Sequence, residues 1–263
     1  MDVRLFPNSS RPGVGLRPRR ESQRPLLPQH ARHCPVLEAG SETGFLVYPP
    51  LAENESFRIE FEGDGKYRFT FFMGAPGQGW QPIFSVAIAL PLGGVGSTRE
   101  EVTFHVPQPP IPPETARKMA RIFIVPEDCG TPAGAVAIRG ATNFQTPEGW
   151  DTVYTPVFNN VERPAAPMLV VRVETDWFVN ETEFRYVLQP GEGFHASPSM
   201  PIGQVFFVPR EAVNLVDATE AEVAALQERK SAYYREKAAK TLLTPYGLQY
   251  SPHYARTAKG NKS

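Results

Sequence analysis

Apolar and polar residues alternate along much of this chain with the period of a β-strand. Phe57, Ile59 and Phe61 are apolar, and each is followed by a charged residue. This alternation is typical of a strand that buries one face. A second apolar segment over residues 66–73 follows Gly63-Asp64-Gly65, and an Asp-Gly pair between two such segments is a strong hairpin signal. The pattern therefore predicts a β-hairpin.

About ten short segments of this kind are separated by Gly and Pro turns, and no long helices alternate with them. The pattern predicts an all-β fold, either an antiparallel β-sandwich or a distorted barrel. Beyond the hairpin, we expect strands at residues 44–48, 84–90, 101–106, 121–125, 135–139, 152–158, 168–174, 183–188 and 204–209.

One long helix is expected near the C-terminus. Residues 217–222 contain two overlapping capping sequences, an Ala-rich and charged stretch follows, and Pro245 ends the pattern. Its apolar stripe is broken, so we expect the helix to pack on the β body, with packing on a protein partner as the alternative. A shorter helical turn is expected at residues 114–120, after a Pro-rich connector.

Composition divides the chain into four regions. Residues 1–33 are rich in Arg, Pro, Ser and Gln and predict a disordered basic arm. Residues 34–216 form the expected β-rich domain, residues 217–243 the C-terminal helix, and residues 244–263 a basic tail. We expect the arm and the end of the tail to be dispensable for folding, because they contain few apolar groups.

Charge and cysteine content exclude several classes of protein. Residues 34–226 contain 12 basic and 24 acidic residues, which argues against a nucleic-acid-binding core. Two cysteines cannot form a disulfide scaffold, so a reduced, cytoplasmic protein is expected. The chain has no apolar run of membrane-spanning length and no apolar segment of a signal peptide near its start.

The histidines do not predict a metal centre or a cofactor. None of the five has a carboxylate two residues later, as the iron-binding strands of cupin-like oxygenases usually do. His30, His33 and Cys34 lack a second cluster that would complete a zinc site. Cys129 lies among acidic residues, which disfavour its thiolate, so we expect an inert thiol rather than a nucleophile.

Acidic and aromatic residues are dense between residues 174 and 207. The carboxylates at 174, 176, 181 and 183 could form pairs with raised pKa values or a divalent-ion site, although solvated edge positions are the favoured interpretation. Most of the aromatic side chains should belong to the core. Those that face outward, together with Arg172, Arg185 and Arg210, could line a concave site for a small or peptide-like ligand.

Several motifs occur in a recognisable order: ARHCPV, GFLVYPP, TPEGWDTVYTPVFN, VETDWF, LQPGEGF and PIGQVFFVPRE. Together they resemble a family of uncharacterised bacterial proteins described as a domain of unknown function. The match covers roughly residues 31–212 and departs from the family in the N-terminal arm and around residues 93–114. The resemblance implies a single β-rich domain and no particular activity. Trp150, Asp176, Trp177 and Arg210 match motif positions, so we expect them to make structural or ligand contacts.

These observations favour a non-catalytic ligand-binding or accessory module. The alternatives are a metal-independent or carboxylate-based enzyme that uses Asp176 on a small or peptide-like substrate, and an assembly component that uses the helix and tails. Strand alternation after residue 174 predicts that Trp177 lies in the core and that Asp176 faces outward.

Overall fold

The computed structural model describes residues 1–21, 32, 34–75, 79–91, 96–126, 132–160, 167–243, 245, 247 and 249–260. Contacts divide the chain into two compact units. The first contains Met1–Arg32 and Leu37–Arg210, and the second contains His33–Val36 and Glu211–Ser263. Strands in antiparallel sheets predominate, as expected. Helices occur as well, so the description all-β is only approximate.

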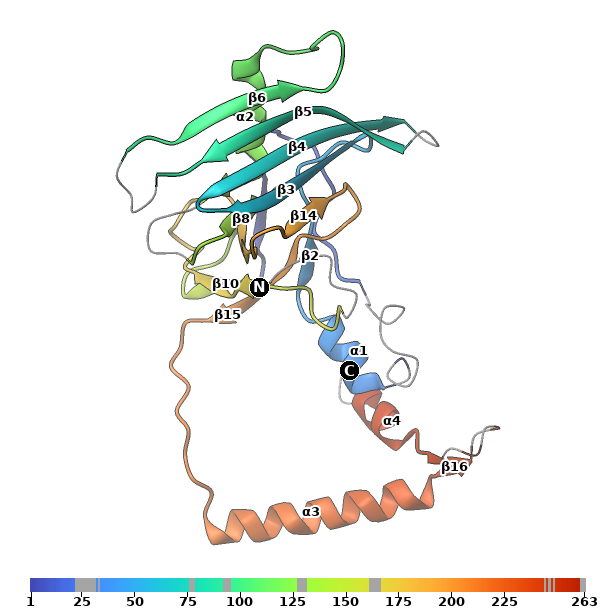
Figure 1. Cartoon of the computed structure of the whole chain (residues 1–263). Helices are drawn as coiled ribbons and strands as arrows, with labels where there is room; N and C mark the ends of the chain where they lie inside the picture. Colours follow the sequence, from blue (N-terminus) through green and yellow to red (C-terminus); the bar gives the residue numbers. More distant parts are fainter. Residues whose placement is uncertain are drawn as a thin grey trace. The chain divides into compact units, whose positions relative to one another are not determined.

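The largest sheet of the first unit has five antiparallel strands and forms the upper layer in Figure 1. The predicted hairpin is confirmed, with residues Asp64 and Gly65 of its turn at φ 48° and 69°. Both values lie in the left-handed region that tight hairpin turns require. The strand order is β14 (Gly193–Ala196), β3 (Glu55–Gly63), β4 (Lys66–Ala75), β5 (Gly79–Ala89) and β6 (Arg99–Phe104).

Two four-stranded sheets complete most of this unit. One has the order β12 (Val171–Val173), β10 (Trp150–Thr155), β15 (Gly203–Pro209) and β2 (Phe45–Val47), and α1 (Pro35–Ser41) precedes β2. The other has the order β11 (Met168–Leu169), β13 (Glu183–Val187), β8 (Ala135–Arg139) and β7 (Ile124–Pro126). In the part of the chain that the structure describes, none of the sheets closes into a barrel.

The strand expected over residues 168–174 is divided between these two sheets. β11 pairs with β13, whereas β12 pairs with β10. The chain changes sheet at Val170, which is 63% exposed. Because of this crossing, β12 and β13 belong to different sheets, and a cleft lies between them.

The core joins the inward faces of the sheets to one helix. Phe57, Phe69, Ile138 and Phe184 are fully buried in a single apolar cluster. Phe123 of α2 (Pro113–Phe123) stacks on Phe69, with ring centroids 6.0 Å apart and an angle of 10° between the ring planes. Aromatic packing of this kind adds to the stabilisation from apolar burial.

The strand expected at residues 121–125 is wrong for its first three residues, which form the end of α2. Ala116, Ala120 and Phe123 are the buried residues of this helix, and their spacing is helical. Pro113 stands at the start of the helix, where a missing N–H costs nothing. The apolar composition of residues 122–125 hid this spacing, because β-branched and aromatic residues favour strands.

The expectation of a disordered arm over residues 1–33 is wrong for residues 1–21. β1 (Arg4–Pro7) pairs with β9 (Thr142–Gln145), and Asn8 is almost fully buried and donates to the carbonyl of Gly140. Arg11 forms a bidentate pair with Glu55, at 2.5 and 2.9 Å. Composition could not reveal these contacts, because the partners are distant in sequence. Residues 22–31 and 33 lie outside the described residues.

The second unit contains α3 (Glu220–Ala239), β16 (Leu242–Leu243), β17 (Gln249–Tyr250) and α4 (His253–Gly260). The predicted capping box is present between Thr219 and Glu222. Residues 249–260 include a strand and a helix, so they are not the plain tail expected from the sequence. α3 buries none of its residues. Its expected packing on the β body stays a prediction. None of the helices in the described residues is long and apolar enough to cross a membrane.

Candidate functional site

Two arginines converge on the buried carboxylate of Asp151, whose side chain is 2% exposed. Arg210 donates to Oδ1 from Nε and Nη2, at 2.9 and 2.7 Å, and Arg172 donates to Oδ2 from Nε at 2.6 Å. Asp151 lies on the middle of three adjacent strands, β12, β10 and β15, with Arg172 on one neighbour and Arg210 directly after the other. The sheet order therefore brings the three charges together.

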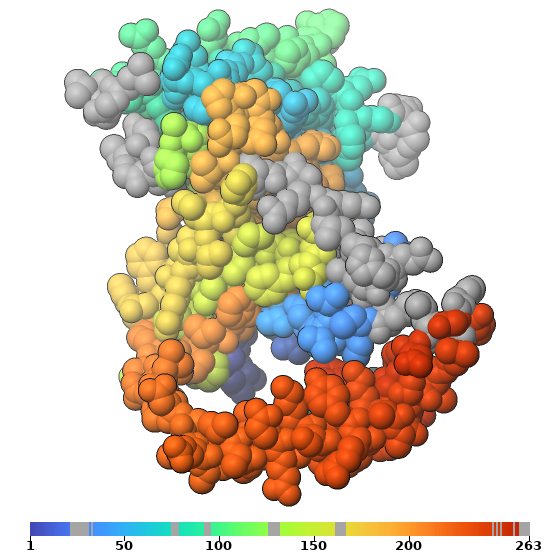
Figure 2. Space-filling model, turned by 60° about the horizontal axis from the view of Figure 1, so that its bottom comes forward, coloured from blue at the N-terminus to red at the C-terminus, as the bar shows by residue number. Residues whose placement is uncertain are grey.

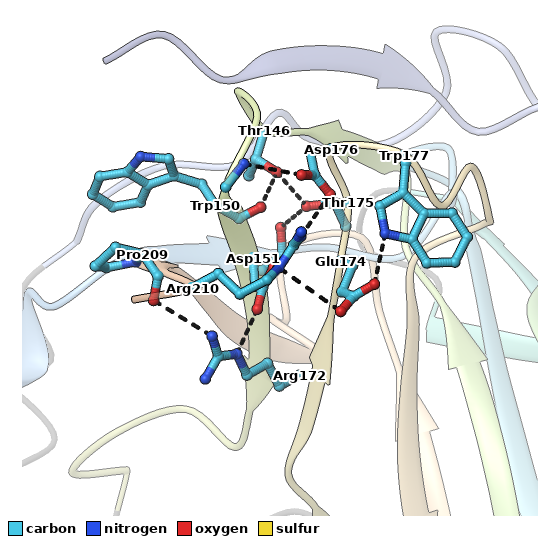
Figure 3. A network of polar contacts seen from close by, with 12 residues as sticks. Thr146, Trp150, Asp151, Arg172, Glu174, Thr175, Asp176, Trp177, Pro209 and Arg210 are labelled. Carbon is cyan, nitrogen blue, oxygen red and sulfur yellow. Dashed lines mark hydrogen bonds and ion pairs between the residues drawn. The ribbon is translucent and has the colours of Figure 1, made fainter. Parts of the chain in front are cut away.

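Asp176 extends the network to two turns. Arg210 donates to its Oδ1 from Nη2 at 2.7 Å, and the Gly149 N–H donates to its Oδ2 at 3.0 Å. The Arg210 N–H in turn donates to the Gly149 carbonyl at 2.7 Å. Figure 3 shows Arg210 between the two aspartates. Asp176 thus holds the turn before β10 against the end of β15.

Both aspartates remain ionised at neutral pH. Burial raises the pKa of Asp151, but hydrogen bonds and charge from Arg210 and Arg172 outweigh it and hold that pKa below its ordinary value. The hydrogen bond from Arg210 is the main reason why the pKa of Asp176 is also lowered. Each carboxylate oxygen already accepts a hydrogen bond, so neither side chain is poised to act as a general base.

Trp177 does not lie in the core, because its side chain is 64% exposed. The N–H groups of Trp177 and Phe178 both donate to the Glu174 carbonyl, so residues 174–178 form a turn in which strand alternation does not apply. The indole Nε1 donates to a Glu174 carboxylate oxygen at 2.6 Å. Trp150 is half-buried, and Figure 3 shows its indole pointing away from the network.

A cluster of threonine hydroxyls lies under the charged network. The Thr175 hydroxyl is 2.6 Å from that of Thr152 and 2.9 Å from that of Thr146, which donates to the Trp150 carbonyl. All three side chains are buried. Sequence reasoning missed this cluster, although polar residues at buried positions of β10 were a signal for it. The hydroxyls fix the start of the turn that contains Asp176.

A cleft of about 280 Å³ opens beside this network, between β12 and β13. Its volume is close to the lower limit of typical small-ligand pockets, which is roughly 300 Å³. Val171, Val173 and Phe178 give it an apolar side, and Thr175 belongs both to the cleft and to the hydroxyl cluster. The remaining lining residues are polar or amphipathic: Tyr154, Asn180, Glu181, Glu183 and Arg185.

The carboxylates of the cleft are held separately rather than paired with each other. Glu181 accepts from the backbone N–H and hydroxyl of Ser9 and from the side chain of Asn143. Burial raises the pKa of Glu181, but these hydrogen bonds lower it below its ordinary value. Glu183 accepts from Arg139 at 3.2 Å. Glu181 therefore lacks the raised pKa expected of a carboxylate pair. Glu181 and Glu183 also have different hydrogen-bond partners.

Tyr154 completes the polar end of the cleft. It is buried, and that burial raises the pKa of its phenol to about 12. The phenol therefore stays protonated at neutral pH. Glu181 is therefore ionised and Tyr154 neutral near pH 7, so neither of these two side chains exchanges a proton there.

His105 and His195 do not join this site. His105 Nε2 lies 2.7 Å from the Ser85 hydroxyl on the five-stranded sheet, but Ser85 is only 3% exposed and inaccessible to a substrate. His195 lies on β14, where burial is the main cause of its lowered pKa. Cys129, His30 and His33 lie outside the described residues. The described residues contain no group of three or more His, Cys, Asp or Glu side chains that could hold a metal ion.

Comparison of the chain with protein-family models, with curated proteins and with solved structures gave no match. The family resemblance of the motifs therefore stays a prediction. The candidate site is defined by its own geometry, which consists of a charged clamp, a hydroxyl cluster and the cleft beside them.

Proposed function

We propose that this chain is a non-catalytic ligand-binding module whose ligand occupies the cleft between β12 and β13. The observation that carries the proposal is the combination of an apolar side, formed by Val171, Val173 and Phe178, with separately held carboxylates at the other end. Small-ligand sites usually combine an apolar surface with a few well-placed polar groups. We also propose a β-sandwich as the architecture that positions this cleft.

The site supports binding better than carboxylate-based catalysis. An acid-base pair requires one carboxyl whose pKa lies near the operating pH, and this usually comes from burial without compensating hydrogen bonds. Asp151, Asp176 and Glu181 are instead stabilised as anions by their donors. A fixed anionic environment suits recognition of a ligand that donates hydrogen bonds.

The ligand that fits this arrangement is small, with an apolar or aromatic part and a donor group that is neutral or cationic. Phe178 is 43% exposed, so its ring offers a surface on which an apolar group can pack. Glu183 lies across the cleft on β13 and can accept from a donor group. Arg185 on the same strand also lines the cleft and offsets part of the negative charge there.

The proposal can be tested by ligand-observed NMR with two probes of similar shape, 2-phenylethylamine and 3-phenylpropionate. We expect the amine to show saturation transfer from the protein and the carboxylate to show little. Phe178→Ala should remove the signal, whereas Val179→Ala, at a neighbouring position that is 91% exposed and outside the cleft, should not. Absence of binding by both probes, or binding that survives Phe178→Ala, would contradict the proposal.

A further inference from the structure

α3 is a 20-residue helix that buries none of its side chains. Most helical stability in proteins comes from packing of one face rather than from the helix alone, so an unpacked helix is unusual. Within its own unit, α4 contacts α3 near the C-terminal end, where the rings of Tyr233 and His253 are 4.9 Å apart. The first half of α3 has no such cover, and Figure 2 shows its side chains in orange.

The charges of α3 change sign at the middle of the helix. Residues 220–228 contain three Glu and no basic residue, whereas residues 229–240 contain five Lys or Arg and one Glu. The change falls between Glu228 and Arg229. The helix therefore has an acidic half and a basic half of nearly equal length.

The helix dipole explains only part of this pattern. Acidic side chains are favourable in the first turn and basic ones in the last, but the effect falls off beyond those turns. Glu222 and Lys237 fit this explanation, and Glu222 also completes the capping box. Glu228, Arg229 and Lys230 lie in the middle of the helix, where the dipole gives no reason for a sharp change of sign.

An apolar stripe accompanies the charges. Val223, Leu226 and Tyr234 are 46%, 54% and 54% exposed, and their spacing of three and eight residues places them on one side of the helix. Lys230 lies between Leu226 and Tyr234 on the same side and can cover apolar surface with its aliphatic stem. Tyr233 follows Leu226 by seven residues and lies at the edge of this side, whereas Glu236 belongs to a neighbouring side. Both contact His253 of α4, so α4 covers the edge of the stripe at Tyr233, while Val223, Leu226 and Tyr234 stay exposed.

We propose that α3 is a self-association surface that pairs in an antiparallel manner with α3 of a second copy of this chain. An antiparallel pair places the acidic half of each helix beside the basic half of the other, whereas a parallel pair would place like charges together. Val223 and Tyr234 are equally far from the change of sign between residues 228 and 229. They therefore come face to face across the pair.

The pair should be weak and dependent on concentration. A helix of 20 residues is about 30 Å long, and a single seam of this length buries less than the roughly 800 Å² per partner of a standard stable interface. Charge complementarity of exposed groups is also screened by salt. This inference is independent of the cleft and stands whether or not the cleft binds a ligand.

Sedimentation velocity of the full chain over a range of concentrations tests the association. We expect a monomer-dimer equilibrium that weakens in molar salt. Leu226→Glu should raise the dimer dissociation constant by about tenfold or more, which corresponds to 1.4 kcal/mol. Ala225→Glu adds the same charge on the opposite side of the helix and should change it far less. A strictly monomeric wild-type chain, or equal effects of the two variants, would overturn the proposal.

Disulfide formation tests the direction of the pair. In a background of Cys34→Ser and Cys129→Ser, chains with Val223→Cys and chains with Tyr234→Cys are oxidised separately and as a mixture. We expect the mixture to form a cross-linked dimer much faster than either variant alone. Faster cross-linking of each variant with itself would indicate a parallel pair and would overturn the antiparallel arrangement.

Discussion

At the scale of single residues, Asp151 shows how a carboxylate can be required by the fold while being unavailable for chemistry. Both of its oxygens accept from guanidinium groups, and the side chain is 2% exposed. Asp151→Asn should lower the urea midpoint of unfolding clearly, because Arg172 and Arg210 lose their shared anion. Asp64→Asn removes one charge at an exposed turn where Asn is also accepted, so it should leave the midpoint nearly unchanged.

The two aspartates also predict how stability depends on pH. Their pKa values in the folded chain lie below the ordinary value of 3.8, so the folded state favours the ionised form. Their contribution is fully present above about pH 4 and is lost as the pH falls through the lowered values. Melting curves should show a loss of stability in acid, and this loss should be smaller in Asp151→Asn. An identical acid profile for both proteins would contradict this assignment.

Truncation of Trp177 and of Phe184 should change the stability of the protein by very different amounts, although both are large aromatic residues of the same region. Trp177 is 64% exposed, so Trp177→Ala should change the free energy of unfolding by no more than about 0.5 kcal/mol. Phe184 is fully buried, so Phe184→Ala should cost roughly 3–5 kcal/mol. Chemical denaturation of the two variants checks this. A large loss in the free energy of unfolding for Trp177→Ala would contradict the exposed position of this side chain.

Sequence reasoning recognised part of the candidate site. The structure brings Asp176 and Arg210 into one network and places Trp177 beside it, so the motif positions are neighbours in space. The environment of Trp177 could not be predicted, because the turn at residues 174–178 breaks the alternation on which its burial was inferred. The hydroxyl cluster was missed because its members are separated by up to 29 residues, and only the sheet order brings them together.

At the scale of elements, the predictions succeeded where an element is defined by its own sequence. The β3-β4 hairpin has a local turn signal and regular alternation, and the capping box of α3 is also local. They failed where distant segments decide the structure. All four residues of β1 are exposed, and they form a strand because they pair with the edge of β9, about 136 residues later in the sequence. The division of residues 168–174 between two sheets likewise depends on partners that no local pattern reveals.

The N-terminal segment should therefore contribute measurably to stability. Arg11 and Glu55 are 19% and 12% exposed and form two charge-assisted hydrogen bonds. Arg11→Ala should lower the free energy of unfolding by about 2 kcal/mol, because it leaves the Glu55 carboxylate without its cation. Arg17→Ala removes an exposed arginine of the same segment and serves as the matched control. Equal stabilities of the two variants would contradict this prediction and would support the disordered arm expected from the composition.

At the scale of the whole molecule, proteolysis should separate residues 212–263 from the rest of the chain. All residues from Glu211 to Thr219 are exposed and lie outside helices and strands. A protease that cleaves after Glu should therefore cut at Glu211 early and release a fragment of residues 1–211. We expect this fragment to keep a cooperative thermal transition, because it contains the buried core. Mass spectrometry of the early products identifies the site, and a first cut within the sheets would contradict the division.

The pairing of β1 with β9 also has a consequence for synthesis. Residues 4–11 are synthesised before their partners at Glu55, Gly140 and Glu181, the last of which lies 172 residues after Ser9. Because contacts between distant residues form slowly, residues 4–11 must wait for their partners while most of the first unit is made. A bulky domain placed directly before residue 4 would lie next to this late-forming strand, so it should reduce the yield of folded chain more than the same domain inserted in the exposed segment of residues 211–219.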